Sequence, residues 1–122
     1  MTIDKQKLGS LGEEMAAEFY EQRGYRIRDR NISYSCGELD LIAQAADGTV
    51  VFVEVKTRSS AHFGVAESVT VGKFRRMRGA AVNWLQDKPH SPIRFDVITV
   101  VLNERTGQHT VDCYEGIDHG AG

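Results

Sequence analysis

The most restrictive stretch of the sequence is VFVEVKTR, residues 51–58, which places two charged residues inside the pattern of a core strand. Its valines alternate with larger side chains, which is typical of a β-strand that enters a hydrophobic core. Side chains two residues apart on a strand share a face, so Phe52, Glu54 and Lys56 point one way and the valines the other. Burial of an unpaired carboxylate is costly, so Glu54 must be paired, bind a metal ion or lie at an open edge of the sheet.

The preceding segment supplies an acidic partner for Glu54. It is predicted to form a strand from Glu38 to Gln44, followed by a hairpin turn with an Asp-Gly signal at residues 46–48 and a second strand from Val50 to Thr57. With that turn at the centre, Asp40 falls opposite about position 55, within one residue of Glu54. Two neighbouring carboxylates repel each other, and a shared divalent cation removes the repulsion.

A pair of carboxylates predicts a particular metal chemistry. Oxygen ligands suit Mg²⁺ or Mn²⁺, and a cation held by Asp40 and Glu54 can activate a water and stabilise charge on a phosphate. Lys56, on the same face as Glu54, would position that water or neutralise the developing charge. The alternative is a simple Glu54–Lys56 ion pair on a half-exposed strand, with Asp40 as an acid near a turn. The residues alone leave both interpretations open.

Two helices are predicted from apolar side chains at helical spacing. The first covers about residues 5–23 and ends at Gly24, a natural C-terminal stop. The second begins after Thr70, which can cap it, and ends near Asp87. The apolar stripe of the first helix consists of Leu8, Leu11, Met15 and Phe19, and that of the second of Phe74, Met77, Ala81, Trp84 and Leu85, so that Trp84 is expected in the core.

The strands complete an α-β-β-β-α-β(-β) order, which predicts an α/β or α+β fold with a mixed sheet flanked by helices. Residues 25–34 alternate only in part and predict an edge strand. Residues 93–102 form the longest apolar strand, and residues 109–114 a hairpin strand that follows it. A loop is expected at 64–70 and a frayed end at 116–122.

Length and composition indicate one domain, since 122 residues with 41% hydrophobic content suffice for one core. We expect the core to span about residues 5–102 and the C-terminal hairpin strand and tail to occupy 103–122. The sequence contains no apolar run of membrane-spanning length and no secretory signal, which predicts a cytoplasmic protein. Cys36 and Cys113 are then expected to be free thiols, and the histidines show no zinc-type spacing.

Charge is segregated along the chain although the net charge is only −2. Residues 56–94 hold eight basic side chains against two acidic ones, whereas residues 31–55 hold four acids and no Lys or Arg. Basic residues suit phosphates and clustered carboxylates suit a metal ion. The alternative is an ordinary solvated surface.

Asp40 followed by Glu54-x-Lys56 resembles the signature of the PD-(D/E)XK nuclease superfamily, whose core is α-β-β-β-α-β. Leu39 stands where that superfamily has a proline. Over about residues 9–102 the chain more closely resembles the YraN-like family of bacterial proteins, which is similar to archaeal Holliday-junction resolvases. The matching positions are Gly9, Gly12, Glu13, Asn31, GELDLIA (37–43), FVEVKTR (52–58), Gly64, Lys73 and RFDVI (94–98).

This resemblance implies a restriction-endonuclease-like fold, metal-dependent endonuclease chemistry on DNA, branched DNA as one substrate, and a homodimer. It also implies a further acid from the first helix. Glu13 lies beside the small residues Gly9, Gly12 and Ala16, which would let the helix approach the sheet, so Glu13 is predicted to join Asp40 and Glu54 at the metal. The alternative is an acid on the helix surface near the N-terminal dipole. The solvent face would carry Glu14, Glu18 and Glu21.

Several further residues are candidates with two interpretations each. Glu38 shares the face of Asp40 and is either an outer group of the metal site or an acid at a strand entry. The basic candidates for contacts with nucleic-acid phosphates are Arg58, Lys73, Arg75, Arg76 and Arg78, and their alternative is the surface of an ordinary soluble helix.

Three functions remain compatible with these residues. The first is a Mg²⁺-dependent or Mn²⁺-dependent nuclease-like protein that acts on DNA. The second is a nucleic-acid-binding module of the same fold that cleaves nothing. The third is an interaction protein whose acids pair only with its own basic residues.

Overall fold

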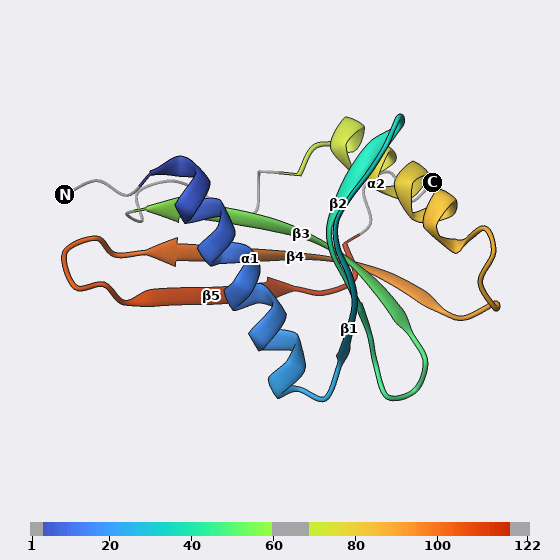
Figure 1. Cartoon of the computed structure of the whole chain (residues 1–122), viewed down its shortest axis with the longest axis horizontal. Helices are drawn as coiled ribbons and strands as arrows, with labels where there is room; N and C mark the ends of the chain where they lie inside the picture. The colour runs from blue at the N-terminus through green and yellow to red at the C-terminus, as the bar shows by residue number, and fades with distance from the viewer. Residues whose placement is uncertain (1–3, 60–68, 118–122) are drawn as a thin grey trace.

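The computed structural model describes residues 4–59 and 69–117, and its elements follow the predicted order (Figure 1). Every boundary lies within two residues of the expected one. The loop predicted for 64–70 falls largely outside the described residues, as does the chain after Ile117. The helices are α1 (Lys5–Gln22) and α2 (Val71–Leu85), and the strands are β1 (Arg26–Tyr34), β2 (Gly37–Gln44), β3 (Val50–Ser59), β4 (Ile93–Leu102) and β5 (His109–Tyr114).

The five strands form one mixed sheet in the order β1-β2-β3-β4-β5. Strands β3 and β4 are parallel and are joined through α2, whereas the other neighbours are antiparallel. A parallel pair needs such a crossover connection, and a helix usually makes it. The predicted αβββαβ core with a mixed sheet flanked by helices is therefore confirmed.

The two helices cover opposite faces of the sheet (Figure 1). Val51 and Val53 of β3 pack beneath α1, while Val50 and Phe52 pack against α2. This alternation follows from the two-residue period of a strand. Because both faces are covered, the central strands are almost continuously apolar, and Glu54 is the charged exception within the buried part of β3.

The buried face of α1 differs from the predicted stripe. Leu8, Gly12, Ala16 and Tyr20 face the sheet, whereas Met15 and Phe19 are only half-buried. The expected close approach occurs at Gly12, where a Cβ atom would lie 2.9 Å from the Cβ of Thr57 on β3. At Gly9 a Cβ atom would meet nothing within 4 Å. The contact face predicted from the large apolar residues is therefore wrong, because small residues form the centre of the actual face.

A buried ionic network joins α1 to β4 on this face. Asp96 is fully buried and accepts hydrogen bonds from the Tyr20 hydroxyl (2.6 Å) and the Arg94 guanidinium (2.9 and 3.0 Å). It also accepts one from the Gly116 N–H (3.1 Å), and the N–H of Ile117 bonds to β4. The prediction that the chain frays from Gly116 is therefore wrong for residues 116 and 117. Burial and the Asp96 charge raise the pKa of Tyr20 well above its usual range.

Several smaller predictions concern the edges and the cysteines. β1 is an edge strand as expected, and Asn31 interrupts it with a φ of +50°. Trp84 is buried against Phe52, and its indole N–H donates to Asp29 (3.0 Å), so its assignment to the core is confirmed. Cys36 and Cys113 are free thiols. No helix in the described part of the chain is long and apolar enough to cross a bilayer.

The two glycines of α1 give opposite predictions. Gly12→Ala places a methyl group against the branched side chain of Thr57, and we expect it to lower the free energy of unfolding by about 1–3 kcal/mol. Gly9→Ala meets open space within a helix, and we expect it to raise that free energy by about 0.5–1 kcal/mol. Urea denaturation of both variants measures the difference, and equal gains would contradict the close packing at Gly12.

Candidate functional site

The pairing of β2 with β3 ends inside the sheet. The antiparallel ladder runs from Gln44–Val50 to Leu41–Val53 and stops there. One position further, the Asp40 carboxylate, not a backbone carbonyl, accepts the N–H of Val55 (2.9 Å). Beyond this point β2 continues beside β1 only, and β3 continues beside β4 only. The two strands therefore diverge at Asp40.

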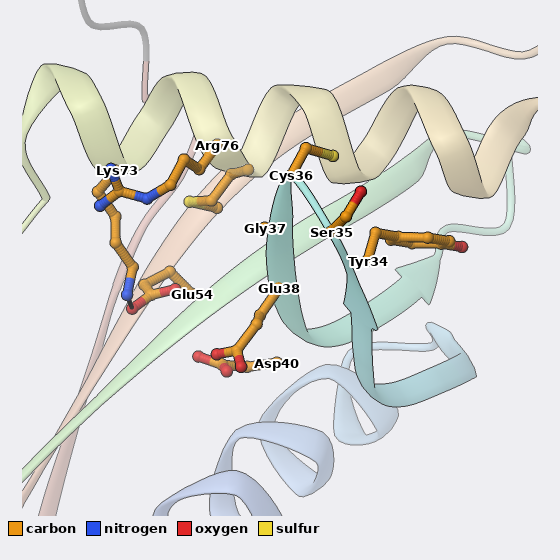
Figure 2. Close-up of a pocket in the computed structure, with 10 residues that line it drawn as sticks. Tyr34, Ser35, Cys36, Gly37, Glu38, Asp40, Glu54, Lys73 and Arg76 are labelled. Atoms are coloured by element: carbon orange, nitrogen blue, oxygen red, sulfur yellow. Dashed lines mark ion pairs between the residues drawn. The ribbon is translucent and has the colours of Figure 1, made fainter.

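A pocket of about 320 Å³ lies at this divergence (Figure 2). Its walls come from β2, β3, the β1–β2 turn and α2. Figure 2 shows Lys73 reaching down from α2 to Glu54, Arg76 lying along the helix toward Lys73, and Glu38 and Asp40 on the β2 side. The structure thus brings acids from two strands and cations from a helix to one opening, although these residues are far apart in the sequence.

Glu54 is the most buried charged group of the pocket, with 6% of its side chain exposed. Its Oε2 atom lies 3.3 Å from the Nζ of Lys56 and 3.1 Å from the Nζ of Lys73. The predicted shared face of Glu54 and Lys56 is therefore observed, and their ion pair is formed. Lys73, a candidate for phosphate contacts, contacts Glu54 directly in the structure.

Asp40 has an unusual electrostatic environment. Burial raises its pKa from the ordinary 3.8 to about 6, and the charges of Glu54 and Glu13 add to this effect. The hydrogen bond from Val55 and the charge of Lys73 act in the opposite direction. Two acids from neighbouring strands and a third from α1 therefore act on one another, as the hairpin pattern predicted for Asp40 and Glu54.

The position of Glu13 follows from the packing of α1. It adjoins Gly12, the residue that lets the helix approach Thr57, and it is half-buried. Its neighbour Glu14 instead pairs with Arg30 at the surface (3.0 Å). Glu14, Glu18 and Glu21 are all exposed, which confirms the predicted solvent face of α1.

The carboxylates of Asp40 and Glu54 suit a magnesium site in which the protein supplies only a few of the ligands. Across residues 4–59 and 69–117 no three His, Cys, Asp or Glu side chains converge closely enough to hold a metal ion. Mg²⁺ commonly binds one or two carboxylates and keeps several waters or substrate phosphate oxygens. Asp40 and Glu54 supply two carboxylates where β2 and β3 diverge, and the charges of Glu54 and Glu13 act on Asp40. The role of all three as metal ligands stays a prediction.

The predicted basic residues fall into two groups. Lys73 and Arg76 line the pocket. Arg75 and Arg78 are exposed on α2 and do not line it, and Arg58 lies further along β3, where its guanidinium donates to the carbonyl of Thr57 (3.1 Å). The structure therefore brings two of the five candidate cations to the acids, and their contact with phosphate stays a prediction.

Part of the pocket wall was not anticipated. The turn between β1 and β2 packs against α2, where a Cβ atom at Gly37 would lie 2.5 Å from the carbonyl oxygen of Arg76. The Ser35-Cys36-Gly37 turn signal was visible in the sequence, but nothing in it pointed to α2. The wall residues that the sequence did not point to are Ser35, Cys36, Gly37 and Met77.

Comparisons with known proteins identify relatives over most of the chain. Residues 12–100 match a family described as "Uncharacterised protein family UPF0102". A UPF0102 protein of Corynebacterium efficiens is 54% identical over 121 residues, which cover 99% of both chains. One of Nocardia farcinica is 51% identical over 102 residues, covering 81% of this chain and 80% of that protein. One of Bifidobacterium longum is 44% identical over 105 residues, covering 82% and 85%.

Two solved structures show a more distant likeness. An EndoMS–dsDNA complex matches with a TM-score of 0.39 and 18% identity, over 73% of this chain and 34% of that one. The SfsA protein of Pyrococcus furiosus in complex with Ca²⁺ matches with a TM-score of 0.46 and 15% identity, over 95% and 66%.

The environment of Asp40 predicts a pH-dependent stability. Because its pKa is raised to about 6 in the folded protein, the native state binds more protons than the unfolded chain between pH 4 and 6. The contribution of Asp40 to the free energy of unfolding should therefore fall as pH rises through this window. Without divalent cations, we expect Asp40→Asn to be about 1–2 kcal/mol more stable than wild type above pH 7 and to gain little at pH 4.

Urea denaturation between pH 4 and 8 measures this effect. Glu18→Gln, which neutralises an exposed acid of α1, serves as the control for the loss of one negative charge. A stability gain of Asp40→Asn that is the same at pH 4 and pH 8 would contradict the assigned environment of Asp40.

Proposed function

The chain belongs to the uncharacterised protein family UPF0102, and we propose that it is a metal-dependent nuclease-like protein that binds DNA and hydrolyses its phosphodiester bonds. The observation that carries this proposal is the facing pair Asp40 and Glu54. Both acids line a pocket open to solvent, Asp40 terminates the β2–β3 ladder, and burial together with the charge of Glu54 raises the pKa of Asp40.

The residues of the pocket have distinct proposed roles. Asp40 and Glu54 would hold Mg²⁺ or Mn²⁺, which when bound lowers the pKa of water and offsets charge on phosphate oxygens. The hydrogen bond from Val55 keeps the Asp40 carboxylate in one orientation. Lys56, whose ammonium lies 3.3 Å from Glu54, would orient the attacking water and offset the negative charge that develops. Glu13 would add negative charge that favours the cation.

The cations around the pocket support a polyanionic substrate. Lys73 and Arg76 line the opening, and Arg75 and Arg78 extend the positive charge along the exposed surface of α2. Arg58 adds charge on β3. Phosphate contacts of this kind carry most non-specific affinity for DNA and weaken with salt. Branched DNA as the preferred form and a homodimer as the active state rest on the resemblance to Holliday-junction resolvases, and we propose both on that basis.

One observation favours a second candidate, a module of the same fold that does not cleave. The charge of Glu54 is already balanced by two lysines, each within 3.3 Å of one carboxylate oxygen. Such a buried network would serve structure alone if no cation ever replaced a lysine. The two candidates differ in whether Mn²⁺ binds and whether a bound cation leads to cleavage.

The proposal predicts metal-dependent cleavage by the wild type. We expect a labelled four-way DNA junction to be cut in Mg²⁺ or Mn²⁺, and Asp40→Asn, Glu54→Gln and Lys56→Gln each to lower the rate by about 100-fold or more. Gel analysis of the products, with a linear duplex of the same sequence in parallel, measures rate and substrate preference. Glu18→Gln, the same change at an exposed acid, should cut like the wild type.

The alternatives give different results in this experiment. Mn²⁺ binding that Asp40→Asn abolishes, with no cleavage of either DNA, would favour the binding module. Identical metal binding by wild type and Asp40→Asn would refute the site. Faster cleavage of the linear duplex would refute the preference for branched DNA while leaving the nuclease intact.

A further inference from the structure

Two ammonium groups pair with the single carboxylate of Glu54, although one would balance its charge. The ammonium groups of Lys56 and Lys73 both lie within 3.3 Å of the same oxygen, Oε2. Lys56 comes from the same strand, two residues away, whereas Lys73 reaches down from α2 (Figure 2). The second lysine is therefore a separate contribution of the fold, and it connects α2 to the acid pair.

The position of Lys73 is unfavourable unless an anion is nearby. It lies in the first turn of α2, where its backbone N–H donates a hydrogen bond to the hydroxyl oxygen of the capping residue Thr70 (3.1 Å). The helix dipole is positive at this end and disfavours a cation. Glu54 supplies the missing anion in this structure, and a phosphate group would supply it as well, because helix N-termini and ammonium groups both bind phosphate.

A divalent cation would compete with the two lysines for the charge of Glu54. A magnesium ligand oxygen lies about 2.0–2.1 Å from the ion, so a cation on this carboxylate would stand near ammonium groups that both contact its Oε2 atom. Like charges at short separations repel in a partly buried site. We therefore expect the lysine that is freer to move to leave Glu54 when the cation binds.

The two lysines differ in their freedom to leave. The Lys73 side chain is 36% exposed and begins on a helix above the pocket, whereas that of Lys56 is 20% exposed and begins on β3 beside Glu54. The flexible four-carbon stem of Lys73 allows its ammonium to reach the open pocket without any backbone movement. Arg76, three residues later on α2, also lines the pocket and extends the positive charge there.

We propose that Lys73 is a metal-released phosphate ligand: it neutralises Glu54 in the metal-free protein, leaves when a divalent cation binds Asp40 and Glu54, and then binds a phosphate oxygen of the nucleic acid. This inference rests on the proposed function and adds a regulatory step to it. Cation and DNA then bind cooperatively, since the cation frees the ammonium that the DNA needs. Before the cation binds, the pocket holds Lys73 away from DNA.

The first test measures the cation alone. Mn²⁺ is titrated calorimetrically into wild type, Lys73→Met and Lys7→Met, the last being the same change at an exposed lysine of α1. Because one of the two ammonium groups that compete with the cation on Glu54 is then absent, we expect Lys73→Met to bind Mn²⁺ about threefold or more tightly than wild type. Lys7→Met should stay within about twofold of wild type. Circular dichroism confirms that each variant is folded.

The second test measures DNA binding in EDTA. Glu54→Gln removes the charge that retains Lys73, so we expect it to bind a labelled four-way junction about threefold or more tightly than wild type. Glu54→Gln combined with Lys73→Met should lose this gain, whereas Glu54→Gln combined with Lys7→Met should keep it. That contrast separates release of Lys73 from the simple removal of a negative charge.

The outcomes separate this inference from the proposed function. Tighter Mn²⁺ binding by Lys73→Met together with the loss of the DNA gain supports the exchange. Equal Mn²⁺ affinity of wild type and Lys73→Met overturns the exchange while the metal site stands. No Mn²⁺ binding by the wild type overturns the proposed metal site and this inference with it.

Discussion

The end of the β2–β3 ladder is the constraint on which the site depends. A backbone N–H inside a sheet must find an acceptor, and past Leu41–Val53 the N–H of Val55 finds the carboxylate of Asp40. This substitution lets the two strands part and at the same time holds Asp40 at the point of divergence. Glu54, on the opposing position of β3, then faces the opening. The pocket and its acids therefore have one origin in the hydrogen bonding of the sheet.

The structure contains a second buried carboxylate that shows what a structural role looks like. Asp96 is sealed beneath α1 and is satisfied by a hydroxyl, a guanidinium and a backbone N–H. Its guanidinium partner, Arg94, makes two hydrogen bonds to it in a fixed geometry. Glu54 instead faces a pocket and is paired with two flexible ammonium groups. Partners that can exchange distinguish a site for ligands from an ion pair that only holds the fold.

Sequence periodicity predicted most of the fold because the strands have strong two-residue patterns and clear turns. The register of Asp40 came out one residue off, since the loop after Gln44 centres on Asp47 and not between Asp47 and Gly48. The contact face of α1 was mispredicted because Gly12 and Ala16 carry no hydrophobic signal. The site residues on β2 and β3 could be predicted from the sequence because a local hairpin links the two strands. The contact of Lys73 with Glu54 could not be predicted, because it depends on how closely α2 packs on the sheet.

That packing explains a final regularity of the site. A glycine lies at a close contact of each helix with the sheet: Gly12 of α1 meets Thr57 of β3, and Gly37 at the start of β2 meets the backbone of α2 at Arg76. Each glycine directly precedes an acid near the pocket, Glu13 in one case and Glu38 in the other. A side chain at either glycine would push a helix outward and would move the neighbouring acid or the cations of α2 with it. Stability and site geometry are therefore governed by the same two contacts.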